Sequence, residues 1–96
     1  MHSLSIRPAA KNDIQDIVDY YDNLSPKLTD NFLNELDTCI EDIRKMPKAY
    51  QKRFHEIRVI FLKRFPFGVF YKMYGKKVVV IAVLHTSRNP EIWKKR

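Results

Sequence analysis

The chain has 96 residues, of which 45% are hydrophobic and 12% aromatic, and a net charge of +7. This size and composition exclude a disordered tail and a second domain, so we expect a single folded domain over residues 1–96. No apolar run approaches the ~20 residues that span a bilayer, and the N-terminus shows no apolar signal core, which predicts a cytoplasmic protein without membrane contact. Cys39 is the only cysteine and the three histidines lie far apart, so we expect no disulfide, metal or cofactor.

The charges are unevenly distributed along the chain. Acidic residues predominate in residues 1–43, whereas residues 44–96 contain fifteen Lys or Arg and only two acids, Glu56 and Glu91. This asymmetry predicts an anionic partner for the C-terminal half, which is RNA, DNA or an acidic protein segment. The simpler alternative is a solvated basic face without a partner.

The first two expected elements are a short strand and a helix. Residues 4–7 alternate apolar and polar side chains, and Pro8 ends the strand because proline donates no ladder hydrogen bond. An amphipathic helix of about four turns follows, with Asp13 near its positive N-terminal end. The apolar stripe of this helix consists of Ala10, Ile14, Ile17, Val18, Tyr21 and Leu24.

A second helix is expected after a break at residues 23–26. Ser25 is placed to cap free N–H groups, and Pro26 suits the first helical position, where its missing donor costs nothing. Met46 and Pro47 end the helix, and the short connection makes the two helices antiparallel neighbours. The apolar residues of the second helix are Leu28, Phe32, Leu36, Cys39, Ile40 and Ile43.

The remaining elements are expected to be strands. Residues 48–54 form a polar basic connection, and residues 56–62 form the next strand. Residues 65–85 then form two long strands joined by a tight turn, for which Gly75 supplies the positive φ. Because residues 78–84 are apolar without a break, we expect the last strand to be covered on both faces and central in the sheet.

Together these elements predict an α+β fold with the order β-α-α-β-β-β. A helical hairpin packs on one face of a small, mostly antiparallel sheet, because that face is the only surface that can bury the apolar stripes of the helices. We expect basic side chains to gather on the other face of the sheet, where they meet the anionic partner.

Short motifs follow one another along nearly the whole chain. They are Ala10, Asp13, Ile14, Ile17, Tyr20 and Tyr21 in the first helix, Met46-Pro47 at the end of the second, Arg58, the run Arg64-Phe65-Pro66-Phe67 with Val69-Phe70-Tyr71, and Val83-Leu84-His85 with Arg88-Asn89-Pro90. In this order and spacing they resemble the RelE/ParE superfamily of toxins from type II toxin–antitoxin modules. The likeness is greater to the ParE-like, plasmid-stabilisation branch.

The resemblance implies one partner and two rival activities. The partner is a small antitoxin whose acidic segment wraps the toxin and masks its functional face. ParE-like relatives inhibit DNA gyrase without a known catalytic residue, whereas RelE-like relatives are ribosome-dependent endonucleases that cut mRNA. A third hypothesis, from another class, is a non-toxic basic module that binds nucleic acid.

RNA cleavage needs a base for the ribose 2′-hydroxyl, a cation on the phosphate and an acid for the leaving oxygen. The candidate catalytic residues are Glu56 as base, Arg64, Arg88 or Arg58 as phosphate clamp, and His85 as acid, with Trp93 available to stack on a base. Each has a structural alternative. Glu56 can form a surface ion pair, His85 can close its strand with a hydrogen bond, Arg88 can tie down a turn, and Trp93 can anchor the tail.

Inhibition of gyrase needs a complementary surface and no titrating group. The candidate contact residues for a protein target or RNA are Arg58, Arg64, Arg88, Trp93, Lys94, Lys95 and Arg96. RelE-type enzymes tend to carry clustered lysines on the strand after the helices, whereas residues 57–62 contain only Arg58. Gyrase inhibition is therefore the favoured mechanism, and mRNA cleavage is the alternative.

Overall fold

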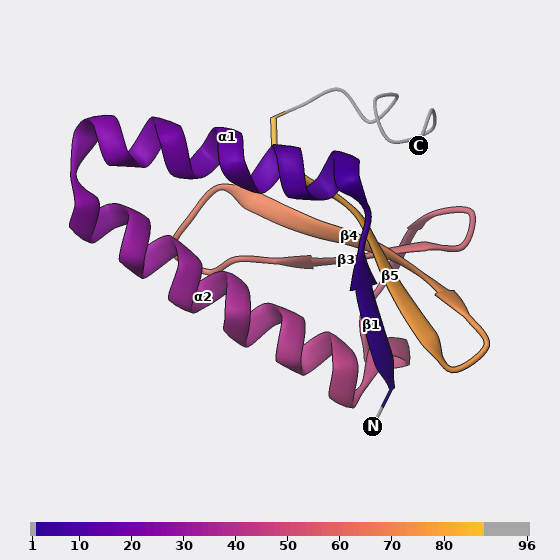
Figure 1. Ribbon diagram of the computed structural model, residues 1–96. Coiled ribbons are helices and arrows are strands. Elements are labelled where there is room, and N and C mark those ends of the chain that lie inside the picture. Colours follow the sequence, from indigo (N-terminus) through magenta and orange to yellow (C-terminus); the bar gives the residue numbers. More distant parts are fainter. Residues whose placement is uncertain (1, 88–96) are drawn as a thin grey trace.

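A helical hairpin packs on one face of a five-stranded sheet in the computed structural model, which describes residues 2–87 apart from the side chain of Phe54 (Figure 1). The helices are α1 (Pro8–Leu24) and α2 (Pro26–Lys45), followed by the short 3-10 helix η1 (Pro47–Ala49). The strands are β1 (Ser3–Ile6), β2 (Lys52–Phe54), β3 (Ile57–Phe61), β4 (Phe67–Tyr74) and β5 (Lys77–His85). The predicted fold class is confirmed.

The sheet has the strand order β1-β5-β4-β3-β2. β1 runs parallel to β5, and every other neighbouring pair is antiparallel. β5 therefore lies inside the sheet, with residues 78–84 buried, as the unbroken apolar run predicted. The sequence analysis missed β2, because three residues that begin with two cations show none of the alternation that identifies a strand.

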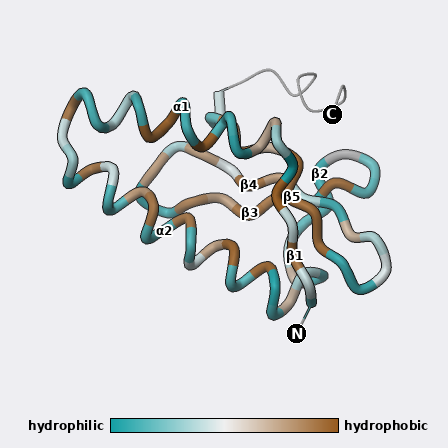
Figure 2. Tube along the Cα trace, in the orientation of Figure 1, coloured by the Kyte–Doolittle hydropathy of each residue, from teal (hydrophilic) through white to brown (hydrophobic). Residues whose placement is uncertain are grey.

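The main core lies between the helices and the sheet. Figure 2 shows hydrophobic positions along the strands beneath the two helices. At the end where the helices join, Phe32 packs edge-on against Phe65 and Phe67, with 5.7 Å between the ring centroids in both pairs. Tyr21 completes this cluster from α1, at 5.4 Å from Phe65. Such pairs contribute ~0.5–1.5 kcal/mol beyond the area that they bury.

The opposite face of the sheet is apolar over its middle. A second buried cluster there consists of Ile57, Val59, Phe70, Val79, Ile81, Ala82 and Leu84. Part of its breadth comes from a bulge in β5, since Phe70 pairs with Ala82 and Tyr71 with Val80. The expectation of a basic far face is therefore wrong for the centre of the sheet.

Two local predictions about the helices are wrong. The Ser25 side chain makes no capping hydrogen bond; instead the Thr29 hydroxyl donates to Asp22 Oδ1 at 2.5 Å, joining the end of α1 to the first turn of α2. Asp13 does not lie in the first turn of α1, and its Oδ2 accepts a hydrogen bond from the Val83 backbone N–H at 3.0 Å. The carboxylate therefore fastens α1 to β5. Gly75 has φ +60° in the hairpin turn, as predicted.

Candidate functional site

Arg58 holds the segment that follows α2. Its Nη1 donates to the carbonyl oxygens of Tyr50 at 2.7 Å and Lys48 at 3.3 Å. Beside it the Tyr71 hydroxyl donates to the Pro47 carbonyl at 2.6 Å. Burial raises the pKa of the Tyr71 phenol to about 12, against the opposing effect of the nearby Arg58 charge. Arg58 is thus engaged in structure within the molecule.

Glu56 lies at the turn between β2 and β3. Its Oε2 pairs with Lys52 Nζ at 3.1 Å, and 77% of its side chain is exposed. The two residues border a hollow of about 350 Å³ whose other lining residues are Lys48, Arg58, Met73 and Gly75. The hollow therefore joins the β2–β3 turn to the end of the β4–β5 hairpin.

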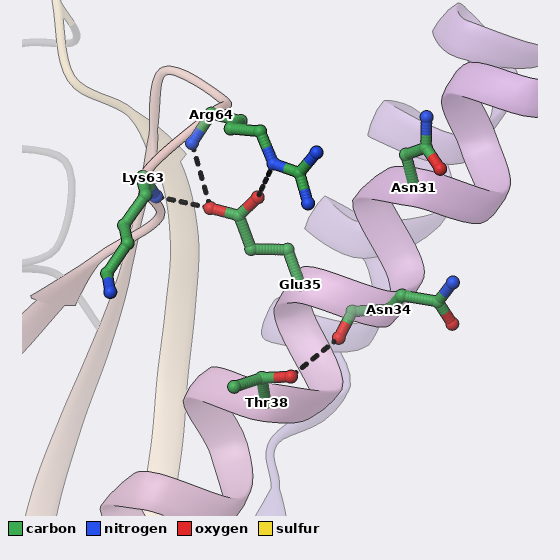
Figure 3. Close-up of a pocket in the computed structure, with 6 residues that line it drawn as sticks. All are labelled: Asn31, Asn34, Glu35, Thr38, Lys63 and Arg64. Atoms are coloured by element: carbon green, nitrogen blue, oxygen red, sulfur yellow. Dashed lines mark hydrogen bonds and ion pairs between the residues drawn. The ribbon is translucent and has the colours of Figure 1, made fainter.

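Arg64 lies on the loop between β3 and β4, beside α2 (Figure 3). Glu35 Oε1 accepts hydrogen bonds from the backbone N–H groups of Lys63 and Arg64, and Glu35 Oε2 lies 3.7 Å from Arg64 Nε. The Arg64 side chain stays 82% exposed while that of Glu35 is 13% exposed. Asn31, Asn34 and Thr38 of α2 complete a recess of about 260 Å³, which the exposed guanidinium borders. Arg64 is thus fixed at its base and open to a partner at its tip.

His85 ends β5 at the opposite end of the hairpin from Glu56. Its Nδ1 accepts a hydrogen bond from the Ser87 backbone N–H at 3.1 Å and lies 2.7 Å from the Ser87 hydroxyl. The ring packs edge-on against Phe67, with 5.4 Å between ring centroids. These contacts close the strand.

The structure does not bring the candidate base and acid together. Glu56 lines the hollow at Gly75, whereas His85 pairs with Phe67 at the start of β4. β4 is eight residues long, so the two ends are ~25 Å apart. Arg58 lies near the start of β3 and Arg64 lies beyond its end. The two arginines line separate hollows.

Several candidate residues lie outside the described part of the chain: Arg88, Trp93, Lys94, Lys95 and Arg96. Their roles stay predictions. Within residues 2–87, no group of three His, Cys, Asp or Glu side chains is arranged to hold a metal ion. In the same part of the chain neither helix is long and apolar enough to cross a membrane.

Sequence reasoning missed Glu35 and the lysines around the hollow at the β4–β5 turn. Nothing in the sequence of α2 separates Glu35 from the other acids of the helix, since only the fold shows that it faces the β3–β4 loop. The charge asymmetry and the pair Lys76-Lys77 indicated a basic surface in the C-terminal half of the chain. The sequence does not show that Lys48 and Lys52 lie at the same end of the sheet as this pair.

Comparison with known proteins identifies the family. A family model described as "ParE toxin of type II toxin-antitoxin system, parDE" matches residues 4–90. The chain belongs to this family of ParE toxins. It is 26% identical over 88 residues to the protein "Toxin ParE2" in each of two strains of Mycobacterium tuberculosis, CDC 1551 / Oshkosh and ATCC 25618 / H37Rv. Each match covers 91% of this chain and 84% of the relative. The resemblance inferred from the motifs is confirmed.

The fold agrees with a solved ParE-related structure. A chain of the structure described as "Chromosomal ParDE TA system from P. aeruginosa" superposes with a TM-score of 0.70 at 20% identity, covering 88% of this chain and 96% of that chain. As a ParE toxin of a type II toxin–antitoxin system, the chain has an antitoxin as its partner.

Proposed function

We propose that this ParE-family toxin arrests growth by binding and inhibiting DNA gyrase until an antitoxin with an acidic segment covers it. Family membership supports a toxin, and the missing strand lysines support gyrase over mRNA. The proposed contact residues are Arg64, whose side chain is 82% exposed, and Arg58, which lines the hollow, together with the predicted Arg88, Trp93, Lys94, Lys95 and Arg96.

The observation that carries this proposal is the separation of Glu56 from His85. A general base must reach the proton that it removes, and the acid must reach the leaving oxygen of the same phosphate, both within hydrogen-bond distance. Two groups a strand length apart do not serve one phosphodiester. A surface that inhibits by binding has no such requirement.

The purified toxin and purified DNA gyrase test this proposal in a supercoiling assay. We expect the toxin to block supercoiling, and Arg64→Gln to weaken the inhibition at least tenfold, because an exposed charge at an interface is lost. Lys27→Gln removes the same charge from the start of α2 and serves as the matched control. His85→Ala should leave the inhibition unchanged.

The same toxin incubated with translating ribosomes, followed by primer extension on the mRNA, tests the alternative. New mRNA ends that disappear in Glu56→Gln and His85→Ala, with gyrase unaffected, would establish cleavage and end the gyrase proposal. Co-expression with the antitoxin should restore growth in either case, and a chain that does not impair growth when induced alone is not an active toxin.

A further inference from the structure

Two turns project from the end of the sheet away from the α1–α2 connection. They are the β2–β3 turn and the β4–β5 turn, and Figure 1 shows both at the same end of the molecule. The hollow lined by Lys52, Glu56, Met73 and Gly75 lies between them. Figure 2 shows both turns as hydrophilic, in contrast to the strands behind them. This end of the sheet is therefore a polar surface formed by two separate hairpins.

The surface is strongly basic. Its exposed cations are Lys48 and Lys52 from the segment before β3, and Lys76 and Lys77 from the β4–β5 turn; we call this set the basic end. Glu56 is the only carboxylate that lines the hollow, and it pairs with Lys52 at 3.1 Å. In the part of the chain that the structure describes, the three ion pairs involve Arg44, Lys52 and Arg64. The other three lysines of the basic end form no ion pair with the described residues.

The hairpin is held in place at this end. Arg7 Nη2, just before α1, donates to the Tyr74 hydroxyl at 3.0 Å, and Tyr74 pairs with Lys77 across the hairpin. Arg58, at the base of the hollow, is occupied by the carbonyl oxygens of Lys48 and Tyr50. The backbone on both sides of the hollow is therefore tied to neighbouring segments, which lowers the cost of ordering it on binding.

The spread of the charges favours a phosphate backbone over an acidic protein segment. The planar fork of arginine matches carboxylates and phosphates alike, and the one arginine that lines the hollow already directs its Nη1 at two backbone carbonyls. The lysines present exposed point charges spread over two hairpins. Such charges match the phosphates of a duplex, which carries one negative charge per ~1.7 Å of its axis.

We propose that the basic end binds the phosphate backbone of duplex DNA without sequence preference. The site is separate from the recess at Arg64, which lies at the other end of β3. It requires neither gyrase nor the antitoxin.

Fluorescence anisotropy with a labelled 20-base-pair duplex DNA and the whole chain, in 50–300 mM KCl, tests the proposal. We expect log K to fall linearly with log[salt], with a slope of about −3 to −4 for four phosphates neutralised. The double variant Lys76→Gln with Lys77→Gln should lower the affinity at 50 mM KCl at least tenfold and reduce the slope by about two.

The matched control is Lys27→Gln with Lys63→Gln, which removes the same two charges from the first turn of α2 and the β3–β4 loop. We expect the slope of log K against log[salt] for this control to equal that of the wild type. Equal weakening by both double variants would show that only net charge matters and would overturn the proposal. Circular dichroism and urea unfolding of all variants establish that each one is folded.

Two further probes separate the class of ligand. A duplex RNA of the same sequence that binds tighter than the DNA would overturn the assignment to DNA. Polyglutamate that binds tighter than DNA at equal salt, and is weakened by Lys76→Gln with Lys77→Gln, would assign the basic end to an acidic protein. Because the assay contains no gyrase, its outcome is independent of the supercoiling experiment.

Discussion

Single buried polar groups decide how the segment after α2 is placed. Tyr71 is fully buried, and its hydroxyl donates to the carbonyl of Pro47, while Arg58 donates to the carbonyls of Lys48 and Tyr50. A buried carbonyl without a donor costs the full desolvation penalty. The start of β2, and with it Lys48 and Lys52 of the basic end, therefore depends on two side chains in β3 and β4.

Tyr71→Phe tests this dependence. The variant keeps the ring but leaves the Pro47 carbonyl buried without its donor, so we expect the free energy of unfolding to fall by about 1–2 kcal/mol, measured by urea denaturation. Tyr74→Phe is the control, since its hydroxyl is on a half-exposed ring and its loss should change the stability by less than about 0.5 kcal/mol.

Alkaline pH should destabilise the protein through the same residue. The pKa of Tyr71 is about 12 in the folded state against 10.0 for an exposed phenol, mainly because burial disfavours the phenolate. The unfolded state therefore releases this proton first, so that about 2–3 kcal/mol of stability is lost as the pH rises from 10 to 12. Burial raises the pKa of the Cys39 thiol to about 11 from 9.0, which adds a loss that begins near pH 9.

Urea titrations between pH 8 and pH 11.5 measure this loss. Above pH 10, the free energy of unfolding of Tyr71→Phe should fall less steeply with pH than that of the wild type. Parallel curves for the two proteins would show that Tyr71 is not the group responsible.

The roles of individual charged residues were the least predictable part of the site. The sequence identified Arg58 and Arg64 as exposed cations, and the alternation of β3 gives only the face on which Arg58 lies. Its hydrogen-bond partners come from a loop whose path the sequence does not determine. Glu35 and Arg64 are likewise joined by the packing of α2 against the β3–β4 loop, which no local pattern encodes.

At the level of elements, the junction of the two helices depends on a side-chain bond that replaces the expected cap. Thr29→Val removes the hydroxyl that donates to Asp22 and should lower the free energy of unfolding by about 1 kcal/mol. Ser25→Ala should change it by less than about 0.5 kcal/mol, because the Ser25 side chain makes no capping bond. Thermal or urea unfolding of both variants checks the assignment, and a larger loss in Ser25→Ala would restore the original prediction of a cap.

The contact between β3 and β4 requires a glycine at position 68. A Cβ there would lie 3.0 Å from Val59 Cγ2 and 3.1 Å from the Phe61 ring, and Val59 is buried. We expect Gly68→Ala to lower the free energy of unfolding by about 1–3 kcal/mol through overpacking, as measured by urea denaturation.

Gly75→Ala provides the comparison, because its Cβ would meet no atom within 4 Å and only the positive φ is strained. Its cost should be about 1 kcal/mol, and Gly75→Asn should recover part of it, since asparagine tolerates the left-handed conformation. A Gly68→Ala variant as stable as the wild type would mean that the Val59 and Phe61 side chains shift without cost.

The elements themselves were largely predictable. Pro26 and the Met46-Pro47 pair marked both ends of α2, and residues 78–84 identified the central strand, because backbone restrictions and long apolar runs act locally. β2 was missed because its three residues show no strand pattern of their own. It is a strand only through its pairing with β3. The apolar cluster on the far face of the sheet was missed for a related reason, as the basic residues of β2 and β3 obscured the pattern.

At the level of the whole molecule, the charge is polarised. Acidic residues predominate on the helical hairpin, whereas the basic residues of the described sheet gather at its ends, around the two hollows. Since fields of this kind orient an approaching partner, we expect the association rate with an acidic antitoxin segment to fall about tenfold or more between 50 and 500 mM KCl. Stopped-flow fluorescence measures this rate, and a rate constant independent of salt would exclude electrostatic steering.

The parallel pairing of β1 with β5 has a consequence for synthesis. Ser3 lies opposite Lys77 and Ile6 opposite Val80, so β1 leaves the ribosome more than seventy residues before the strand with which it pairs. At roughly 5–20 residues per second, translation keeps β1 waiting for several seconds. An interrupted product that stops before β5 lacks the strand to which α1, β1 and β4 all attach. The toxin therefore cannot complete its fold until translation has passed β5, which leaves an interval in which the antitoxin can already be present.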